Sequence, residues 1–284
     1  MPKKAALISI HGMGRTLRNF DDHLLIELEE RLGDKFASLH IGKVYYQGLM
    51  QPNEDRYWKA ANRHLKWEDL RKFLLFGFAD AAGLENGKES PDSVYSQTQQ
   101  LIAQALWKAR AAMDGDGPVV ILAQSLGGQV MSCYFWDAQK AAAGTAVKVG
   151  IWQDIQRFAH AIGGGDALSA DELAFLQGRS LNTLFTTGCN IPLFVAAHDP
   201  QDIVAIRPNP QFKWHNFYDK DDVLGWPLAE LSDSYQSVVT DHRINAGDGI
   251  TGLILKSWNP LAHNEYWGDT DVLEPLTEAL DALL

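Results

Sequence analysis

One ten-residue stretch of the 284-residue chain restricts its fold more than any other: VVILAQSLGG, residues 119–128. Apolar residues run into a serine that has small residues two positions before and after it, and a helical pattern follows. This order predicts a buried strand, a sharp turn and a helix, as in the G-x-S-x-G nucleophile elbow. The turn would lift the hydroxyl of Ser125 clear of the sheet, beside the free N–H groups of a helix N-terminus. A structural serine in an ordinary strand–helix turn is the alternative interpretation.

The rest of the chain alternates short apolar runs with segments of helical periodicity. Strands are expected at 5–10, 39–46, 183–187 and 212–218, and helices at 20–33, 92–113, 126–143 and 273–284. Short apolar strands between helices are typical of a parallel sheet that is buried on both faces. We therefore expect an α/β fold as a single domain over residues 1–284, with a mostly parallel central sheet and helices on both faces.

The segment from about residue 51 to residue 90 differs from the rest by its aromatic content. Its helical pattern carries six large aromatic residues interleaved with leucines, namely Tyr57, Trp58, Trp67, Phe73, Phe76 and Phe78. We interpret it as a helical insertion whose apolar face packs on the main body. The alternative is a cap or a wall that faces the substrate, because residues 73–78 are so apolar.

The composition matters chiefly for what it excludes. A formal net charge of −11 argues against nucleic acid and anionic membrane surfaces as partners, since both require basic patches. Cys133 and Cys189 form neither a disulfide framework nor a metal-ligand spacing. Gly12 and Gly14 lack the third glycine of a dinucleotide-binding loop. The serine-hydrolase interpretation given below implies no metal or organic cofactor. The apolar run at 5–10 is too short for a signal peptide and no stretch approaches a transmembrane span, so the expected location is cytoplasmic.

A serine nucleophile needs a base to take its proton and a carboxylate to orient that base. Of the five histidines that follow Ser125, His263 is the best placed, because it lies in a Pro- and Asn-containing loop just before the last helix. His242 is flanked by charged residues and is interpreted as a surface histidine. His198 lies too close to the strand that precedes it.

Two loops could supply the carboxylate. One contains Asp202, and the other contains Asp219, Asp221 and Asp222 after a stronger strand pattern. An orienting aspartate has to be buried, and the apolar pair at 223–224 is expected to hold Asp222 against the core. Asp219 and Asp221 are expected to be solvated, and Asp202 is interpreted as a surface residue. We therefore predict Asp222 as the acid.

Four motifs, taken together, resemble landmarks of the lipase- and esterase-like branch of the α/β-hydrolase superfamily. They are IHGMG at 10–14, AQSLGG at 123–128, DVLGWPL at 222–228 and HNEYW at 263–267. They occur in the family's order and span most of the chain. The resemblance implies the α/β-hydrolase fold, with a sheet of about eight strands, and a catalytic triad of Ser125, Asp222 and His263.

The resemblance also implies how the reaction's negative charge would be held. In that family, the residue after the His-Gly pair and the residue after the serine supply the N–H groups of an oxyanion hole, and here these are Met13 and Leu126. Gly12 and Gln124 beside them are the implied substrate-binding residues. The chain departs from the family in having Ala123 for a glycine and Gln124 where histidine is frequent, and neither change removes a catalytic group.

The function predicted from the sequence is a serine hydrolase that cleaves an acyl bond in a small molecule. A carboxylic ester is the expected bond, and thioester and amide remain open. The alternative from a different class is a hydrolase-like fold that acts as a non-catalytic binding or scaffolding module. A third hypothesis, an enzyme that works at a lipid surface, rests only on the aromatic segment at 51–90.

Overall fold

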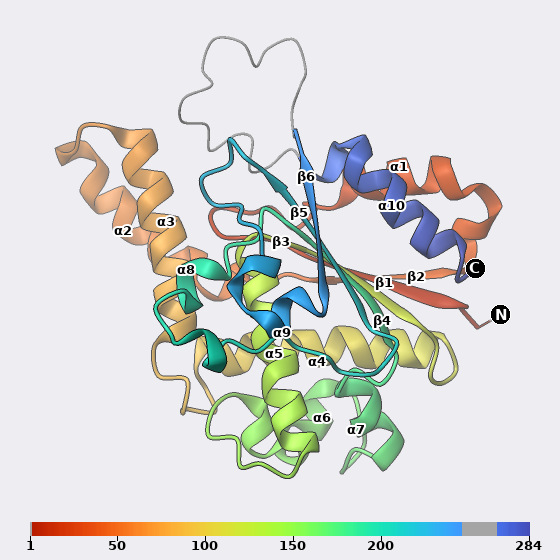
Figure 1. Cartoon of the computed structure of the whole chain (residues 1–284). Coiled ribbons are helices and arrows are strands. Elements are labelled where there is room, and N and C mark those ends of the chain that lie inside the picture. The colour runs from red at the N-terminus through yellow and green to blue at the C-terminus, as the bar shows by residue number, and fades with distance from the viewer. Residues whose placement is uncertain (1, 246–265) are drawn as a thin grey trace.

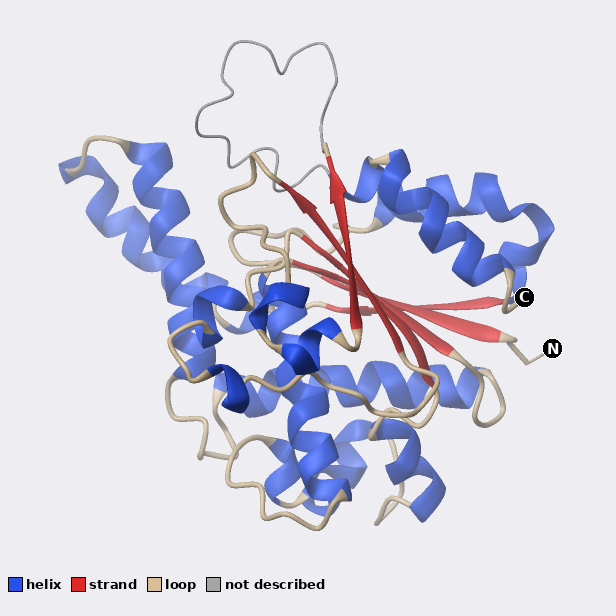
Figure 2. Cartoon of the chain, in the orientation of Figure 1, coloured by secondary structure: helices blue, strands red, loops and turns tan. Residues whose placement is uncertain are grey.

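A six-stranded parallel sheet forms the centre of the molecule (Figure 2). The computed structural model describes residues 2–245 and 266–284. The strand order is β2–β1–β3–β4–β5–β6, and each strand runs parallel to its neighbours. The strands are β1 (Ala5–Ile10), β2 (Leu39–Val44), β3 (Val119–Gln124), β4 (Leu181–Thr187), β5 (Lys213–Asp219) and β6 (Val239–Ile244). The predicted α/β fold with a parallel sheet is thus confirmed, and the described residues contribute six strands where about eight were expected.

Helices cover both faces of this sheet (Figure 1). One face carries α1 (Asp22–Leu32) and α10 (Thr270–Asp281), and the other carries α4 (Val94–Ala112), α5 (Leu126–Ala142), α6 (Ala159–Ile162) and α7 (Ala170–Leu176). Side chains alternate across a strand, so β1 sends Ala6, Ile8 and Ile10 into one buried cluster and Ala5 and Leu7 into the other. Burial on both sides explains why the strands read as unbroken apolar runs.

Helices α2 (Gln51–Ala61) and α3 (Glu68–Glu85) form a pair that projects from the body (Figure 1). Leu84 of α3 is buried in the core of the body and Phe76 is buried beside Trp58 of α2, whereas Leu74 and Phe78 are exposed. The apolar residues of this segment therefore divide between an inner face that packs and an outer face in contact with solvent. Two shorter helices, α8 (Pro192–Val195) and α9 (Asp233–Gln236), lie on the same side of the sheet as α5.

The parallel strands bring the loops that follow them to one edge of the sheet. Ile10 pairs with Ala123, and Gln124 pairs with Thr187, which in turn pairs with Phe217. The chain therefore leaves β1, β3, β4 and β5 at neighbouring points. This is the edge at which ligands bind in open α/β sheets.

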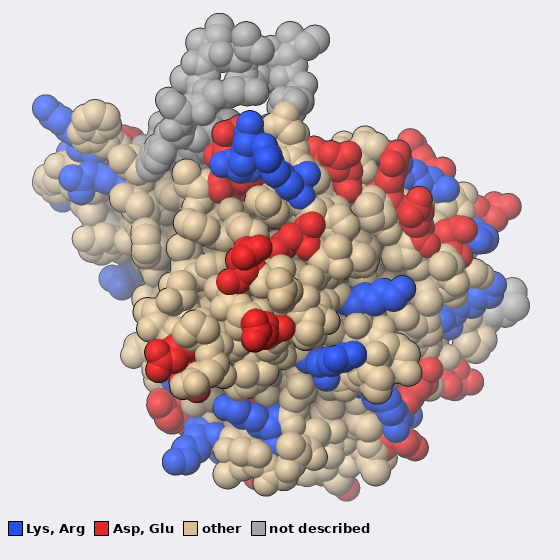
Figure 3. All heavy atoms as spheres, in the orientation of Figure 1, with Lys and Arg blue, Asp and Glu red and all other residues tan. Residues whose placement is uncertain are grey.

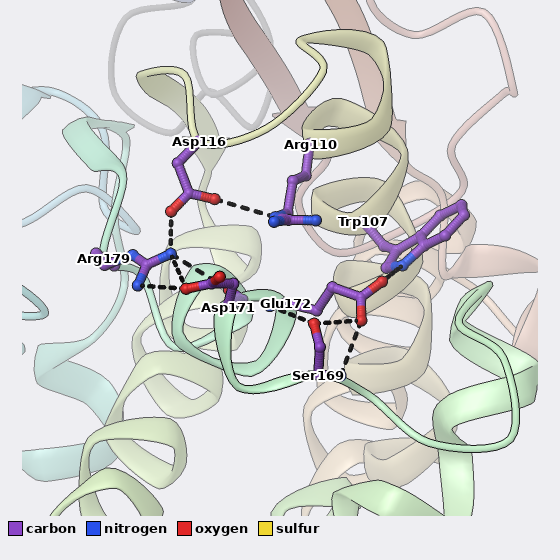
Figure 4. Close-up of polar contacts among 7 residues, drawn as sticks. All are labelled: Trp107, Arg110, Asp116, Ser169, Asp171, Glu172 and Arg179. Carbon is purple, nitrogen blue, oxygen red and sulfur yellow. Dashed lines mark hydrogen bonds and ion pairs between the residues drawn. The ribbon is translucent and has the colours of Figure 1, made fainter.

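A cluster of charged side chains links the loops at the opposite end of the sheet, where the strands begin (Figure 4). Arg179, just before β4, forms ion pairs with Asp116, just before β3, and with Asp171 of α7. Arg110 of α4 donates from Nε to the same Asp116 over 3.0 Å. Single surface ion pairs contribute little, but this cluster bridges two loops and two helices. It holds the amino end of the sheet, away from the edge where the loops after β1, β3 and β5 meet.

Acidic and basic side chains are interspersed on the face of the molecule shown in Figure 3. A broad basic area of the kind that binds nucleic acid is absent from that face. None of the helices within residues 2–245 and 266–284 is long and apolar enough to cross a membrane.

Candidate active site

Ser125 occupies the turn between β3 and α5 in a strained conformation. Strand β3 ends at Gln124 and α5 begins at Leu126, so the predicted strand, turn and helix are present. Ser125 has φ +52° and ψ −122°, and it is one of three non-glycine residues with positive φ in the described part of the chain. Such a conformation costs on the order of 1–3 kcal/mol and persists only where the surroundings impose it. Here the Ser125 N–H donates to the carbonyl of Thr187 over 2.8 Å, which fastens the turn to β4.

The side chain of Ser125 is buried, and its Oγ has no hydrogen-bond partner among the described residues. It stands at the N-terminus of the 17-residue helix α5. Leu126 is the first residue of that helix, so its N–H has no partner within the helix. The positive end of the helix dipole therefore lies next to an unpaired hydroxyl, where it favours negative charge.

The loop that follows β1 closes tightly over this turn. A Cβ on Gly12 would lie 2.8 Å from Cβ and 3.5 Å from Oγ of Ser125, so any side chain at residue 12 would displace the serine. A Cβ on Gly127 would lie 2.5 Å from the carbonyl oxygen of His11. Glycine at both positions lets the loop at 11–14 and the start of α5 pack against each other. Met13 of this loop is half-buried, with its Sδ against Gly77 of α3.

His11 fixes the path of this loop and does not act as a base. Its Nδ1 donates to the carbonyl of Gly12 over 2.7 Å, and its Nε2 accepts from the N–H groups of Tyr46 at 3.1 Å and Gln47 at 3.3 Å. Burial lowers the pKa of His11 to about 4, although the bond to Gly12 opposes that shift. Both ring nitrogens are therefore occupied in a neutral imidazole that stacks on the ring of Tyr46.

Replacing Gly127 with alanine tests the close approach directly. We expect Gly127→Ala to destabilise the fold by about 2 kcal/mol or more, because the new methyl group meets a backbone oxygen that has no room to move. Urea unfolding measures the effect. Gly165→Ala is the matched control, because no heavy atom lies within 4 Å of the added methyl. Equal stability of the two variants would contradict the packing described here.

Asp222 lies in the loop after β5, at the same edge of the sheet as Ser125. It is buried, and its Oδ1 accepts from the N–H of Leu224 over 2.9 Å. Its Oδ2 accepts from the hydroxyl of Tyr266 over 2.8 Å. A Cβ on Gly225 would lie 2.7 Å from that same Oδ2, so glycine is required there for the loop to close on the carboxylate. The carboxylate is thus held in one orientation from two sides.

The neighbours of Asp222 differ in part from the sequence interpretation. Asp219 was expected to be solvated but is buried, because it is the last residue of β5 and its Oδ1 accepts from the N–H of Asp221. Val223 was expected to pack against the core but is 56% exposed. The hydroxyl of Tyr266 and the close approach of Gly225 take its place in enclosing Asp222. Asp202 is exposed, as expected.

Tyr266 and Trp267, which lie just before α10, bind to the ends of β4 and β5 and to the loop with Asp222. The Tyr266 hydroxyl donates to Asp222 and accepts from the N–H of Asp219 over 3.0 Å, and Trp267 Nε1 donates to Thr187 Oγ1 over 3.2 Å. Burial and the nearby Asp222 raise the pKa of Tyr266, which keeps its hydroxyl protonated as a donor. Sequence reasoning gave Tyr266 no role, although it belongs to the HNEYW motif. His263 lies outside the described residues.

The other titratable groups weighed in the sequence are occupied elsewhere or exposed. His215 Nδ1 and His242 Nε2 lie 2.9 Å apart on β5 and β6, and His242 stacks on the ring of Phe217. His160 and His198 are exposed. Burial raises the pKa of the Cys133 and Cys189 thiols to about 12, so neither offers a thiolate at neutral pH. Within the described ranges, no group of three or more His, Cys, Asp or Glu side chains is placed to hold a metal ion.

An apolar cavity of about 250 Å³ lies beside α5. It begins at Gln129, about one helical turn beyond Ser125, and runs between that helix and the segments that contain α8 and α9. Its walls include Trp136, Ile191, Val195 and Tyr235. The cavity gives an apolar group a place to lie on the side of the sheet covered by α5.

Comparisons with known proteins add little to this geometry. No family model matches the chain, and no curated protein matches it. One similar solved structure is RedJ, a thioesterase from the prodiginine biosynthetic pathway in Streptomyces coelicolor. The likeness covers 99% of this chain and 87% of that one, with a TM-score of 0.41 and 10% sequence identity. At this level of similarity, the site has to be argued from its own residues.

The remaining predicted positions fall around the same turn. Leu126 is buried at the start of α5, and Gln124 is the half-buried last residue of β3. The structure therefore packs the loop at 11–14 against the turn at Ser125 and places the loop with Asp222 at the same edge of the sheet. It also adds two residues that the sequence interpretation did not assign, Tyr266 beside Asp222 and Asp80 beside the loop at 11–14.

Proposed function

We propose that the chain is a serine hydrolase of the α/β-hydrolase type that cleaves a carboxylic ester of a small molecule. The observation that carries the proposal is the strained backbone at Ser125, which sets an unpaired hydroxyl at the N-terminus of α5. A positive φ at a non-glycine residue is costly, and such strain clusters at functional sites. A purely structural serine in this turn would need neither the strain nor the unpaired hydroxyl.

Two further features support a triad. Strands β3 and β5 are parallel members of one sheet, so Ser125 and Asp222 follow them at the same edge. Among the histidines, His11 is buried and neutral, His215 and His242 contact each other, and His160 and His198 are exposed. We therefore assign the base to His263, which precedes Tyr266 by three residues in the sequence.

In the proposed reaction, Ser125 Oγ attacks the carbonyl carbon while His263 takes the hydroxyl proton. The carbonyl oxygen becomes an oxyanion, which the N–H groups of Met13 and Leu126 stabilise. The C–O bond to the alcohol then breaks, and the imidazolium returns the proton to the leaving oxygen. Water, activated by the same histidine, attacks the acyl-enzyme and releases the acid and free Ser125.

Asp222 has the role of orienting the histidine and stabilising its charged form. Its hydrogen bonds from Leu224 and Tyr266 suit that role, because they fix the carboxylate without neutralising it. The apolar cavity beside α5 is the proposed site for the acyl group, and Gly12 and Gln124 are the proposed contacts to the reacting group.

A fluorophosphonate probe tests the proposal. We expect it to add one phosphonyl group to the wild-type protein and to map to Ser125 in the peptide mass spectrum, because only an activated serine reacts quickly. A panel of esters and thioesters of increasing acyl length should then show turnover. Absence of labelling together with absence of turnover would point to a hydrolase-like fold that serves as a binding module.

A further inference from the structure

Two carboxyl side chains are buried together where the α2–α3 pair joins the body. Glu54 lies on α2 and Asp80 on α3, and the two are hydrogen-bonded to each other. Gln47 Nε2 donates to Asp80 Oδ1 over 3.2 Å and lies 3.5 Å from Glu54 Oε2. All three side chains are buried. Two carboxylates with negative charge would repel each other here, so the pair is stable only when it holds a proton.

The pair is attached directly to the loop at 11–14. Asp80 Oδ2 accepts from the N–H of Gly14 over 2.7 Å. One helical turn earlier on the same face of α3, Gly77 packs against the side chain of Met13. Gly14 has φ +89°, a conformation that leaves its N–H free to point at Asp80. Helix α3 therefore touches two successive residues of this loop, one of which is the proposed oxyanion donor Met13.

We propose that Asp80, together with its hydrogen-bonded partner Glu54, is a positioning residue that holds the loop at 11–14 in the geometry needed for the oxyanion hole. The inference rests on the proposed hydrolase function for its catalytic meaning, whereas the anchoring of the loop stands on the contacts alone. Asp80 touches no reacting atom. It acts through Gly14 on the orientation of the neighbouring Met13 N–H, and it makes the α2–α3 pair part of the site.

The groups that face the pair explain its dependence on pH. Burial is the main cause that raises the pKa of Glu54 to about 8, and the charges of Asp80 and Asp55 raise it further. Burial raises the pKa of Asp80 as well, and the N–H of Gly14 and the bonds from Glu54 and Gln47 oppose that rise. The donors from Gly14 and Gln47 therefore favour the charge on Asp80 and the proton on Glu54. The other titratable neighbour is the buried hydroxyl of Tyr46, whose pKa is raised by burial and by Asp80. No lysine or arginine among the described residues forms an ion pair with the two carboxyls.

The sign of the pH effect follows from the raised pKa of Glu54. Below its ordinary value of 4.5, Glu54 is neutral in both the folded and the unfolded chain. As the pH rises from about 4.5 to about 8, the unfolded chain ionises first, so the folded state loses stability over that window and the loss then levels off. Above about pH 8 Glu54 ionises in the folded chain as well, next to Asp80. We expect the repulsion between the two carboxylates to weaken the contact of Asp80 with Gly14.

Two variants and a control test the inference. Asp80→Ala removes the acceptor of the Gly14 N–H, Glu54→Gln keeps a neutral hydrogen-bonding partner at every pH, and Glu85→Ala removes an exposed carboxylate from the same helix. Amide hydrogen exchange of the peptide that contains residues 11–17 measures the order of the loop and does not depend on an activity assay. We expect faster exchange in Asp80→Ala and wild-type exchange in Glu85→Ala. If Asp80→Ala fails to fold, Asp80→Asn replaces it, because it keeps the size of the side chain and loses one acceptor oxygen.

Steady-state kinetics then measure the effect of the same variants on kcat and KM. We expect Asp80→Ala to lower kcat about 10²-fold with little change in KM, since a misplacement of about 1 Å in a catalytic group costs that much. The activity of the wild type should fall as the pH rises through about 8, the pKa of Glu54, whereas Glu54→Gln should remain active there. Loop exchange that is equal in Asp80→Ala and Glu85→Ala would overturn the inference. A change in exchange with no fluorophosphonate labelling of the wild type would instead support the anchor and sink the proposed function.

Discussion

Ser125→Ala should abolish ester hydrolysis while leaving the fold intact. The proposed mechanism makes the hydroxyl the attacking atom, so we expect kcat/KM to fall by about 10⁴-fold or more. The fold should survive because Ser125 Oγ has no hydrogen-bond partner among the described residues, and the backbone bond from Ser125 to Thr187 is kept. A sharp turn would suggest that the substitution is tolerated because the hydroxyl is exposed. In this structure the hydroxyl is buried, and the substitution should be tolerated because no hydrogen bond is lost.

The measurement compares initial rates on a soluble ester with thermal unfolding of the same preparations. Fluorophosphonate labelling of wild type and Ser125→Ala controls for a contaminating esterase, because a contaminant would still react in both samples. Substantial turnover in a clean Ser125→Ala preparation would sink the assignment of the nucleophile. An unchanged melting temperature with lost turnover is the expected pair of results.

The second large effect is expected at Asp222. Asp222→Asn should lower kcat by about 10⁴-fold, because an amide in place of the carboxylate favours the wrong tautomer of the histidine. The loop should keep its shape, since the asparagine oxygen can still accept from Leu224 and the Tyr266 hydroxyl can accept from the new NH₂ group.

Asp202→Asn is the matched control for this substitution. Asp202 is exposed in the loop after β4 and also lines the cavity beside α5, so an amide of the same size should leave kcat near the wild-type level, and any effect should fall on KM. The two variants should be assayed side by side across pH 5–9, with circular dichroism to verify folding. A large loss in Asp202→Asn beside near-normal Asp222→Asn would move the acid to the earlier loop.

The strand–turn–helix at Ser125 and the parallel sheet could be predicted because local sequence decides both. Apolar runs such as residues 5–10 are explained only by a strand buried on two faces, and small residues around Ser125 are required by backbone contacts. Strand β6 was harder, because its sequence VTDHRI has polar residues at four consecutive positions. As one of the two edge strands of the described sheet, it needs fewer apolar residues than the strands inside.

The parts that sequence reasoning missed depend on contacts between distant segments. Asp80 resembles any polar residue on an amphipathic helix, and its role appears only when α3 lies beside Gly14. Asp219 looked solvated because charged residues follow it, yet the end of β5 carries it into the interior. Tyr266 contacts Asp222 across a long separation in the chain, for which no local pattern gives a signal.

The order of the sheet has a consequence for how the protein is made. Strand β1 pairs on one side with β2, which follows it closely in the sequence. Its other neighbour is β3, so the partner of Ile10 is Ala123, which is synthesised much later. A chain synthesised from its N-terminus carries β1 with one open edge until β3 leaves the ribosome, and open edges invite pairing with other chains. The turn at Ser125 can approach Gly12 at that stage and gains its bond to Thr187 when β4 follows, whereas Asp222 receives its bond from Tyr266 only after residue 266 has been synthesised. The turn that carries Ser125, the proposed nucleophile, can thus form well before Asp222, the proposed acid, is enclosed.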